Sequence, residues 1–249
     1  MGIDQFGASG RPVQSLEGVA SVLFDLDDTL IDSARGKVIA EARVSEMLFN
    51  YLHSQRINID RKRLLHEILR LDREMNRKRL YNRSSWWQIL LLRLGLEVVL
   101  PQSLTSEVTR EYWHNYGNWS LLFPDTMSTL EALLEKGYLL GLVTDTDGTP
   151  GLKRCRISLL SFRRIFNVVV IAGEDTAETK PSLTPFRLAA SRLGLTCAEC
   201  IFVGDKPFTD IRGARRAGMK SILIRRGTWK SEEPPDFTID SLTELCRIL

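Results

Sequence analysis

The stretch Val22-Leu23-Phe24-Asp25-Leu26-Asp27-Asp28-Thr29-Leu30 decides the fold. An apolar run that ends abruptly in carboxylates is typical of a buried parallel strand, which carries acids to the carboxyl edge of a sheet, where open α/β folds bind ligands. Residues two apart share a face of an extended chain, so we expect Asp25 and Asp27 to face one crevice while Asp28 turns away. Two carboxylates that close repel each other unless a cation, a proton or hydrogen bonds offset the charge. The stretch therefore predicts a metal site.

Three further segments continue this pattern along the chain. Thr144 closes a second apolar strand, Lys180 precedes Pro181, and Gly204-Asp205-Lys206-Pro207-Phe208-Thr209-Asp210 follows another strand. In chain order, the four segments resemble the motifs of the haloacid dehalogenase (HAD) superfamily, and the resemblance covers most of the 249 residues. It implies an α/β fold, namely a Rossmann-like HAD core with a mainly parallel sheet plus an inserted all-helical cap domain.

Helical spacing of apolar residues predicts four helices and no strand between the first and second strands. These helices are expected over residues 35–52, 61–80, 84–94 and 101–116, the third capped by Ser84 or Ser85. In HAD enzymes an insertion at this point is the C1 cap, which closes over the catalytic face. The expected domains are a catalytic core of residues 1–32 and 121–249 and a helical C1 cap of residues 33–120.

From Phe123 onward the predicted strands and helices alternate, which favours a mainly parallel sheet with right-handed crossovers. The later strands are expected at 138–143, 167–172, 200–203 and 221–224. Helices are expected to begin at Pro124-Asp125, Thr149-Pro150 and Thr184-Pro185. Residues 1–18 contain glycine and proline without periodicity and are interpreted as a loose leader.

The composition limits the class of partner. The net charge of +3 comes from 34 basic and 31 acidic residues, so no global field favours nucleic acid or an anionic membrane. No apolar run reaches the roughly 18 residues of a membrane span, and the N-terminus lacks a signal pattern, so a cytoplasmic protein is expected. Of the four cysteines only Cys197 and Cys200 are closely spaced. They are interpreted as incidental thiols, with a redox pair or disulfide as the alternative and too few further ligands for zinc.

The resemblance assigns the two aspartates of the first motif. Asp25 is the nucleophile that attacks a phosphoryl group and becomes an aspartyl phosphate. Asp27 protonates the leaving oxygen and then deprotonates the water that hydrolyses the intermediate, which requires a pKa raised towards the working pH, as neighbouring carboxylates would provide. The superfamily's dehalogenases lack an acid at this position. Asp27 therefore favours phosphoryl chemistry.

The second and third motifs are expected to bind the phosphoryl group. The Thr144 hydroxyl and the backbone N–H of Asp145 would donate to its oxygens, and Lys180 would add a cation that stabilises the transition state. The family more often has Asn-Gly after the hydroxyl residue, whereas this chain has Asp145-Thr146-Asp147-Gly148. The departure adds negative charge near the site.

The resemblance also implies a Mg²⁺ site. Its ligands would be Asp25, the backbone carbonyl of Asp27, and Asp205. Asp210 would support the outer metal shell or orient Lys180. The alternative for Asp210 is the N-cap of the following helix.

The cap region is less informative about specificity. Its aromatic residues either line the closed site or form the core of the cap, and they are Trp86, Trp87, Tyr112, Trp113 and His114. The mixed charges over residues 61–83 are interpreted as a solvated helix face, with a patch that recruits an anionic substrate or nucleic acid as the alternative.

These observations predict a Mg²⁺-dependent phosphatase that hydrolyses a small phosphomonoester and resembles the phosphoglycolate phosphatase-like branch. A cap that closes over the site favours a small phosphorylated metabolite over a macromolecule. The alternatives are a sugar phosphomutase of the same fold, a catalytically silent binding or regulatory module, and nucleic-acid binding through the basic helices. Substrate and oligomeric state cannot be read from the sequence.

Overall fold

The computed structural model describes residue 16 and residues 18–227 and 233–249. The leader expected over residues 1–18 therefore lies almost entirely outside the described residues. Within them, no helix combines the length and the apolar character needed to cross a membrane. All four cysteines are free.

A six-stranded sheet in the order β5-β4-β1-β6-β7-β8 forms one half of the molecule, and every neighbouring pair is parallel. Its strands are β1 (Ser21–Phe24), β4 (Leu139–Asp145), β5 (Val168–Ala172), β6 (Cys200–Gly204), β7 (Lys220–Ile224) and β8 (Phe237–Ile239). The predicted mainly parallel α/β sheet is confirmed, and β8 is a strand that the sequence analysis did not expect.

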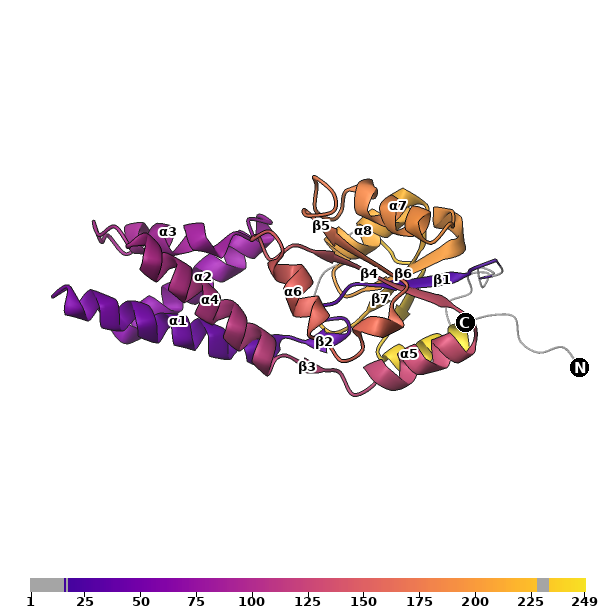
Figure 1. The fold of residues 1–249 in the computed structure, drawn as a ribbon, viewed down its shortest axis with the longest axis horizontal. Coiled ribbons are helices and arrows are strands. Elements are labelled where there is room, and N and C mark those ends of the chain that lie inside the picture. Colours follow the sequence, from indigo (N-terminus) through magenta and orange to yellow (C-terminus); the bar gives the residue numbers. More distant parts are fainter. Residues whose placement is uncertain (1–15, 17, 228–232) are drawn as a thin grey trace, which may run out of the picture.

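β1 lies at the centre of the sheet because its side chains are apolar on both faces. Val22 and Phe24 join the cluster on one face, and Leu23 joins the cluster on the other. Helices α5 (Thr126–Glu135) and α9 (Leu245–Ile248) cover the first face, while α7 (Leu183–Arg192) and α8 (Arg212–Ala217) cover the second (Figure 1).

The register of β1 aligns the functional strand ends. Phe24 pairs with Leu142 of β4 and with Val203 of β6. Asp25, Thr144 and Asp205 follow these three residues by one or two positions, so they emerge at the same carboxyl edge of the sheet.

The other half of the molecule is a bundle of helices, which we call the helical unit (Figure 1). It consists of α1 (Ala34–Ser54), α2 (Arg61–Arg77), α3 (Trp86–Arg93) and α4 (Gln102–Trp119). The unit has a hydrophobic cluster of its own, whose buried members lie between Ala40 and Tyr116. The four helices expected in this region are thus present.

Two short strands correct the expectation that this region contains no strand. β2 (Ile31–Asp32) leads into the helical unit and β3 (Leu121–Leu122) leads out of it, and the two pair antiparallel. Two-residue strands leave no alternating pattern in the sequence, so periodicity could not reveal them.

Two helix starts also differ from those predicted. α6 (Leu152–Ser158) begins after Gly151, which has φ of +79°, and not at Thr149-Pro150. α7 begins after Ser182, whose hydroxyl accepts from the backbone N–H of Thr184. In the second case, a true cap residue lay two positions before the predicted Thr-Pro start.

The predicted cap of the third helix is also displaced. The side chain of Asn82 accepts from the backbone N–H of Ser84 and begins a 3₁₀ turn over Arg83–Ser85, while Ser85 precedes α3 without a side-chain cap. The 3₁₀ turn leads directly into α3, so the capping residue stands one turn earlier than expected.

Candidate active site

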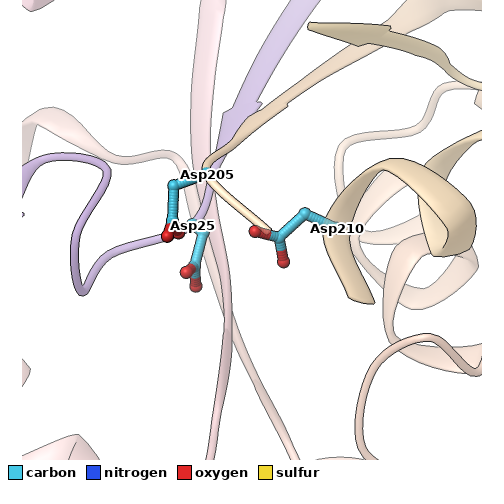
Figure 2. A group of neighbouring side chains, drawn as sticks. All are labelled: Asp25, Asp205 and Asp210. Carbon is cyan, nitrogen blue, oxygen red and sulfur yellow. The ribbon is translucent and has the colours of Figure 1, made fainter. Parts of the chain in front are cut away.

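Three buried carboxylates gather at the carboxyl edge of the sheet (Figure 2). Asp25 directly follows β1, Asp205 directly follows β6, and Asp210 lies in the single π-helical turn Pro207–Ile211. One oxygen from each lies within 4.8 Å of the others. The structure thus brings together residues separated by 180 positions in the chain.

Lys180 lies between two of these carboxylates. Its Nζ donates to Asp25 Oδ1 at 2.8 Å and to Asp210 Oδ1 at 2.7 Å, and the residue is 2% exposed. Asp210 therefore orients Lys180, one of the two roles expected of it. The alternative N-cap role is wrong, because Ile211 precedes α8.

The electrostatics of the cluster are unequal. Burial raises the pKa of Asp205 to about 7, although Lys206 opposes the shift, and the nearby Asp210 and Asp25 raise it further. Burial would also raise the pKa of Asp25, but the Lys180 and Lys206 ammonium groups outweigh burial and hold that pKa below its usual range. Negative charge is thus in excess around Asp205.

This donor set fits Mg²⁺. The site offers carboxylate oxygens, which a hard cation prefers, and it carries more buried negative charge than its lysines neutralise. The cluster contains Asp25 and Asp205, two of the expected ligands, and adds Asp210. The side chain of Asp27 is directed to other partners.

Asp27 is held by two cations and a phenol. Its Oδ1 accepts from Arg156 Nη2 at 2.8 Å and from the Tyr116 hydroxyl at 3.2 Å, and its Oδ2 accepts from Lys153 Nζ. Burial favours the neutral acid, yet Arg156 and Lys153 outweigh burial and lower the pKa of Asp27 well below its usual range. The expected upward shift is therefore wrong for this arrangement, because cations lie closer to Asp27 than other carboxylates do.

Asp147 shares both of these cations. Its Oδ2 lies 2.6 Å from Arg156 Nη1 and its Oδ1 lies 3.0 Å from Lys153 Nζ. Lys153 and Arg156 are three residues apart on α6 and so share one face of that helix. This i,i+3 pair of basic residues on the helix after the second motif is visible in the sequence and was not predicted to contact the site.

The second motif lies where it was expected, but its aspartate has additional partners. Thr144 is 1% exposed at the end of β4. Asp145 Oδ1 accepts from the backbone N–H of Lys180 at 2.9 Å, and its Oδ2 accepts from the Tyr81 hydroxyl at 3.3 Å. The departure from the family's Asn-Gly therefore links the second motif to the third and to the helical unit.

A cavity of about 600 Å³ separates the carboxyl edge from the helical unit. Asp25, Thr144 and Lys180 line it. Asp28 also lines it, which corrects the expectation that this residue turns away. The strand has ended at Phe24 and Asp28 adopts φ of +66°, so the alternation of an extended strand no longer applies.

The helical unit contributes both aromatic and basic side chains to this cavity. Tyr112, Trp113 and Tyr116 line the cavity and also belong to the buried cluster of the unit, whereas Trp86 and Trp87 belong to that cluster alone and His114 does not line the cavity. Basic residues of the 61–83 segment also line it, and these are Arg73, Arg77, Arg79 and Arg83. The interpretation of that segment as a solvated face is therefore wrong for Arg83, which is 4% exposed.

Direct contacts hold the helical unit against the carboxyl edge. Arg79 Nη1 donates to the backbone oxygen of Lys180 at 3.3 Å. Gly148, with φ of +82°, packs so closely that a Cβ there would lie 2.2 Å from the carbonyl carbon of Tyr81. The segment that precedes α3 therefore packs directly against the second and third motifs.

Comparisons with known proteins agree with this geometry. The family model described as haloacid dehalogenase-like hydrolase matches residues 19–218. A glyceraldehyde 3-phosphate phosphatase of Methanopyrus kandleri is 32% identical over 93% of this chain and 97% of its own. A phosphoglycolate phosphatase of Salmonella paratyphi A is 30% identical over 94% and 93%. The crystal structure of a HAD phosphatase from Thermococcus onnurineus superposes with a TM-score of 0.64 at 28% identity, over 92% of this chain and 97% of that one.

Proposed function

Because this chain belongs to the haloacid dehalogenase-like hydrolases, we propose that it is a Mg²⁺-dependent phosphatase of a small phosphomonoester. The observation that carries the proposal is the convergence of Asp25, Asp205 and Asp210 with the Lys180 ammonium at the carboxyl edge, where Asp25 and Lys180 line the cavity. Two similar proteins carry the names of phosphatases of small phosphate esters.

In the first step, the Asp25 carboxylate attacks the phosphorus atom, an acyl phosphate bond forms, and the ester P–O bond breaks. Lys180 lies at 2.8 Å from Asp25 and neutralises charge on the transferred group, which the Thr144 hydroxyl and the Asp145 backbone N–H also bind. Asp27 gives a proton to the leaving alkoxide. The alcohol then departs.

In the second step, Asp27 takes a proton from a water molecule, which attacks the acyl phosphate and releases inorganic phosphate and the free Asp25 carboxylate. The ionised Asp27 of this structure suits the second step. The first step needs the protonated form of Asp27, so the contacts of Lys153 and Arg156 with Asp27 must weaken before that step. Both cations already contact Asp147, which offers them an alternative partner.

Asp25, Asp205 and the Asp27 backbone carbonyl would hold the Mg²⁺, with Asp210 beside it. When bound, the ion would neutralise the phosphoryl oxygens and fix them for in-line attack.

The domain assignment belongs to the same proposal. Residues 1–32 and 121–249 would form the catalytic core, and residues 33–120 the C1 cap. The separate hydrophobic cluster of the helical unit supports this division. A cytoplasmic location stays a prediction of the sequence.

Phosphate release from a panel of small phosphate esters tests the function. We expect turnover with Mg²⁺, loss of turnover with EDTA, and a decrease of at least about 1,000-fold for Asp25→Asn. Asp240→Asn is the matched control, because Asp240 is exposed, pairs with Arg225 and does not line the cavity. Equal turnover by Asp25→Asn and wild type would refute the assigned nucleophile.

A further inference from the structure

The cavity separates its charges between two walls. The carboxyl edge contributes the lining carboxylates Asp25, Asp27, Asp28, Asp145 and Asp147, together with Lys153, Lys180 and Lys206. The helical unit contributes the cations Lys37, Arg73, Arg77, Arg79 and Arg83. Among the described lining residues, the helical unit supplies no carboxylate. A ligand that spans the cavity therefore meets a wall of cationic and neutral side chains opposite the catalytic edge.

Three of these five cations are already engaged. Lys37 and Arg83 both contact the buried Asp72, at 2.5 Å and 3.2 Å, and Arg83 also lies over three aromatic rings. Arg79 donates to a backbone oxygen of the third motif. These three have structural roles, in the helical unit or at its contact with the sheet.

Arg73 and Arg77 are different. They are four residues apart on α2, so they share one face of the helix, and both are exposed at the cavity. Neither forms an ion pair with a carboxylate in the part of the chain that the structure describes. Like charges at this spacing repel each other unless an anion lies between them.

The acids behind this wall do not offset the two arginines. Asp72 is committed to Lys37 and Arg83. Glu41 is buried, and burial and Asp72 raise its pKa to about 7 although Lys37, Arg83 and Arg73 oppose the shift, so near neutrality Glu41 offsets only part of the charge of Arg73. Arg73 and Arg77 therefore keep most of their positive charge at the cavity that they line.

We propose that Arg73 and Arg77 bind a second anionic group of the substrate, a carboxylate or a second phosphate, while the catalytic edge holds the transferred phosphoryl group. This inference rests on the proposed function. The planar guanidinium fork matches the paired oxygens of both anions. Phosphate esters with a second anion are thus preferred to esters whose far end is neutral.

A matched set of three-carbon esters tests the preference. Glycerol 3-phosphate has a neutral far end, 3-phosphoglycerate has a carboxylate there, and glycerol 1,3-bisphosphate has a second phosphate. We expect the wild type to favour at least one of the two esters with an anionic far end by about 10-fold or more in kcat/KM, and the comparison between them distinguishes carboxylate from phosphate.

The variant Arg73→Gln/Arg77→Gln should lose that preference, with kcat/KM for the favoured ester falling about 10-fold or more and kcat/KM for glycerol 3-phosphate changing less than about 3-fold. Arg70→Gln is the matched control, because Arg70 lies on the same helix, is exposed, pairs with Glu67 and does not line the cavity. Equal losses for both kinds of ester would overturn the proposal, as would a wild-type preference for the neutral-ended ester.

Binding separates this inference from the proposed function. Calorimetric titration of Asp25→Asn with the same three esters needs no turnover. Tighter binding of an ester with a second anion, lost in Asp25→Asn/Arg73→Gln/Arg77→Gln, would support the anion site even if no ester is hydrolysed by the wild type. Equal binding of all three esters would overturn the anion site even if the protein is a phosphatase.

Discussion

Tyr116 of α4 donates its hydroxyl to Asp27 Oδ1 at 3.2 Å, so the helical unit touches the residue to which we assign acid and base catalysis. Burial and the nearby Asp27 raise the pKa of Tyr116 well above its usual value, which keeps the hydroxyl protonated. The Arg156 guanidinium lies 4.6 Å from the centre of the same ring. The helical unit therefore helps to place Asp27.

Tyr116→Phe removes this hydrogen bond and keeps the ring. Loss of a hydrogen bond to a charged group is worth about 1.5–3 kcal/mol, so we expect kcat/KM for phosphate release to fall about 10-fold or more. Tyr51→Phe on α1 is the control, since Tyr51 does not line the cavity. An unchanged kcat/KM in Tyr116→Phe would show that Asp27 does not depend on the helical unit.

Gly148→Ala tests the close packing of the helical unit against the second motif. Both Gly148 and Gly151 have positive φ, so alanine costs about 1–2 kcal/mol of strain at either position. Only at Gly148 would the new Cβ also meet the Tyr81 backbone, at 2.2 Å, whereas nothing lies within 4 Å at Gly151. We expect urea denaturation to show a free energy of unfolding that is about 1–3 kcal/mol lower for Gly148→Ala than for Gly151→Ala. We also expect the activity of Gly148→Ala to be at least about 10-fold lower than that of Gly151→Ala. Equal losses of stability and activity in the two variants would mean that the segment before α3 moves to accommodate the new Cβ at little cost.

Glu41 predicts a pH dependence of stability. Burial raises its pKa from 4.5 to about 7, so between these values the folded protein binds a proton that the unfolded chain has lost. The free energy of unfolding therefore falls as pH rises from 4.5 to 7, by up to about 3 kcal/mol, and this contribution is constant above pH 7.

Glu41→Gln should remove that fall, which urea denaturation at several pH values measures against the wild type. The control is Glu46→Gln, because Glu46 is exposed on the same helix. A difference between Glu41→Gln and wild type that stays constant from pH 4.5 to 7 would contradict the burial argument.

Metal binding predicts a change in thermal stability. Mg²⁺ at about 100 times its Kd should stabilise the folded wild type by about 2.7 kcal/mol and raise its Tm. Asp205→Asn should abolish most of this shift. In EDTA, the variant should be at least as stable as the wild type, because it replaces a carboxylate whose charged form is destabilised by burial. Asp240→Asn should keep the whole shift. A Tm that Mg²⁺ raises equally in all three proteins would place the ion elsewhere.

The sequence predicted those site residues that stand at the ends of strands. An apolar run followed by a polar residue marks a strand end, and parallel strands bring their ends together. Asp25, Thr144 and Asp205 therefore meet at one edge as the pattern indicates.

The partners of Asp27 could not be predicted from the sequence, because they lie on helices whose packing is not encoded in a local pattern. Lys153 and Arg156 lie on α6, which follows β4. Tyr116 lies on α4, 89 residues from Asp27. Their contacts depend on how helices pack across the cavity, which no local period reports. The same packing determines the direction in which the pKa of Asp27 shifts, so that direction could not be predicted from the neighbouring carboxylates alone.

The pairing of β2 with β3 has an evolutionary consequence. Ile31 lies opposite Leu122 and Asp32 opposite Leu121, so the chain leaves the sheet half and returns to it at nearly the same point. To the sheet, the 88 or so intervening residues are equivalent to one long surface loop, and such loops tolerate replacement at little entropic cost. Exchange of this insert between homologous genes is therefore able to change recognition while Asp25, Lys180 and Asp205 are kept, and the contact of Tyr116 with Asp27 is exchanged with it.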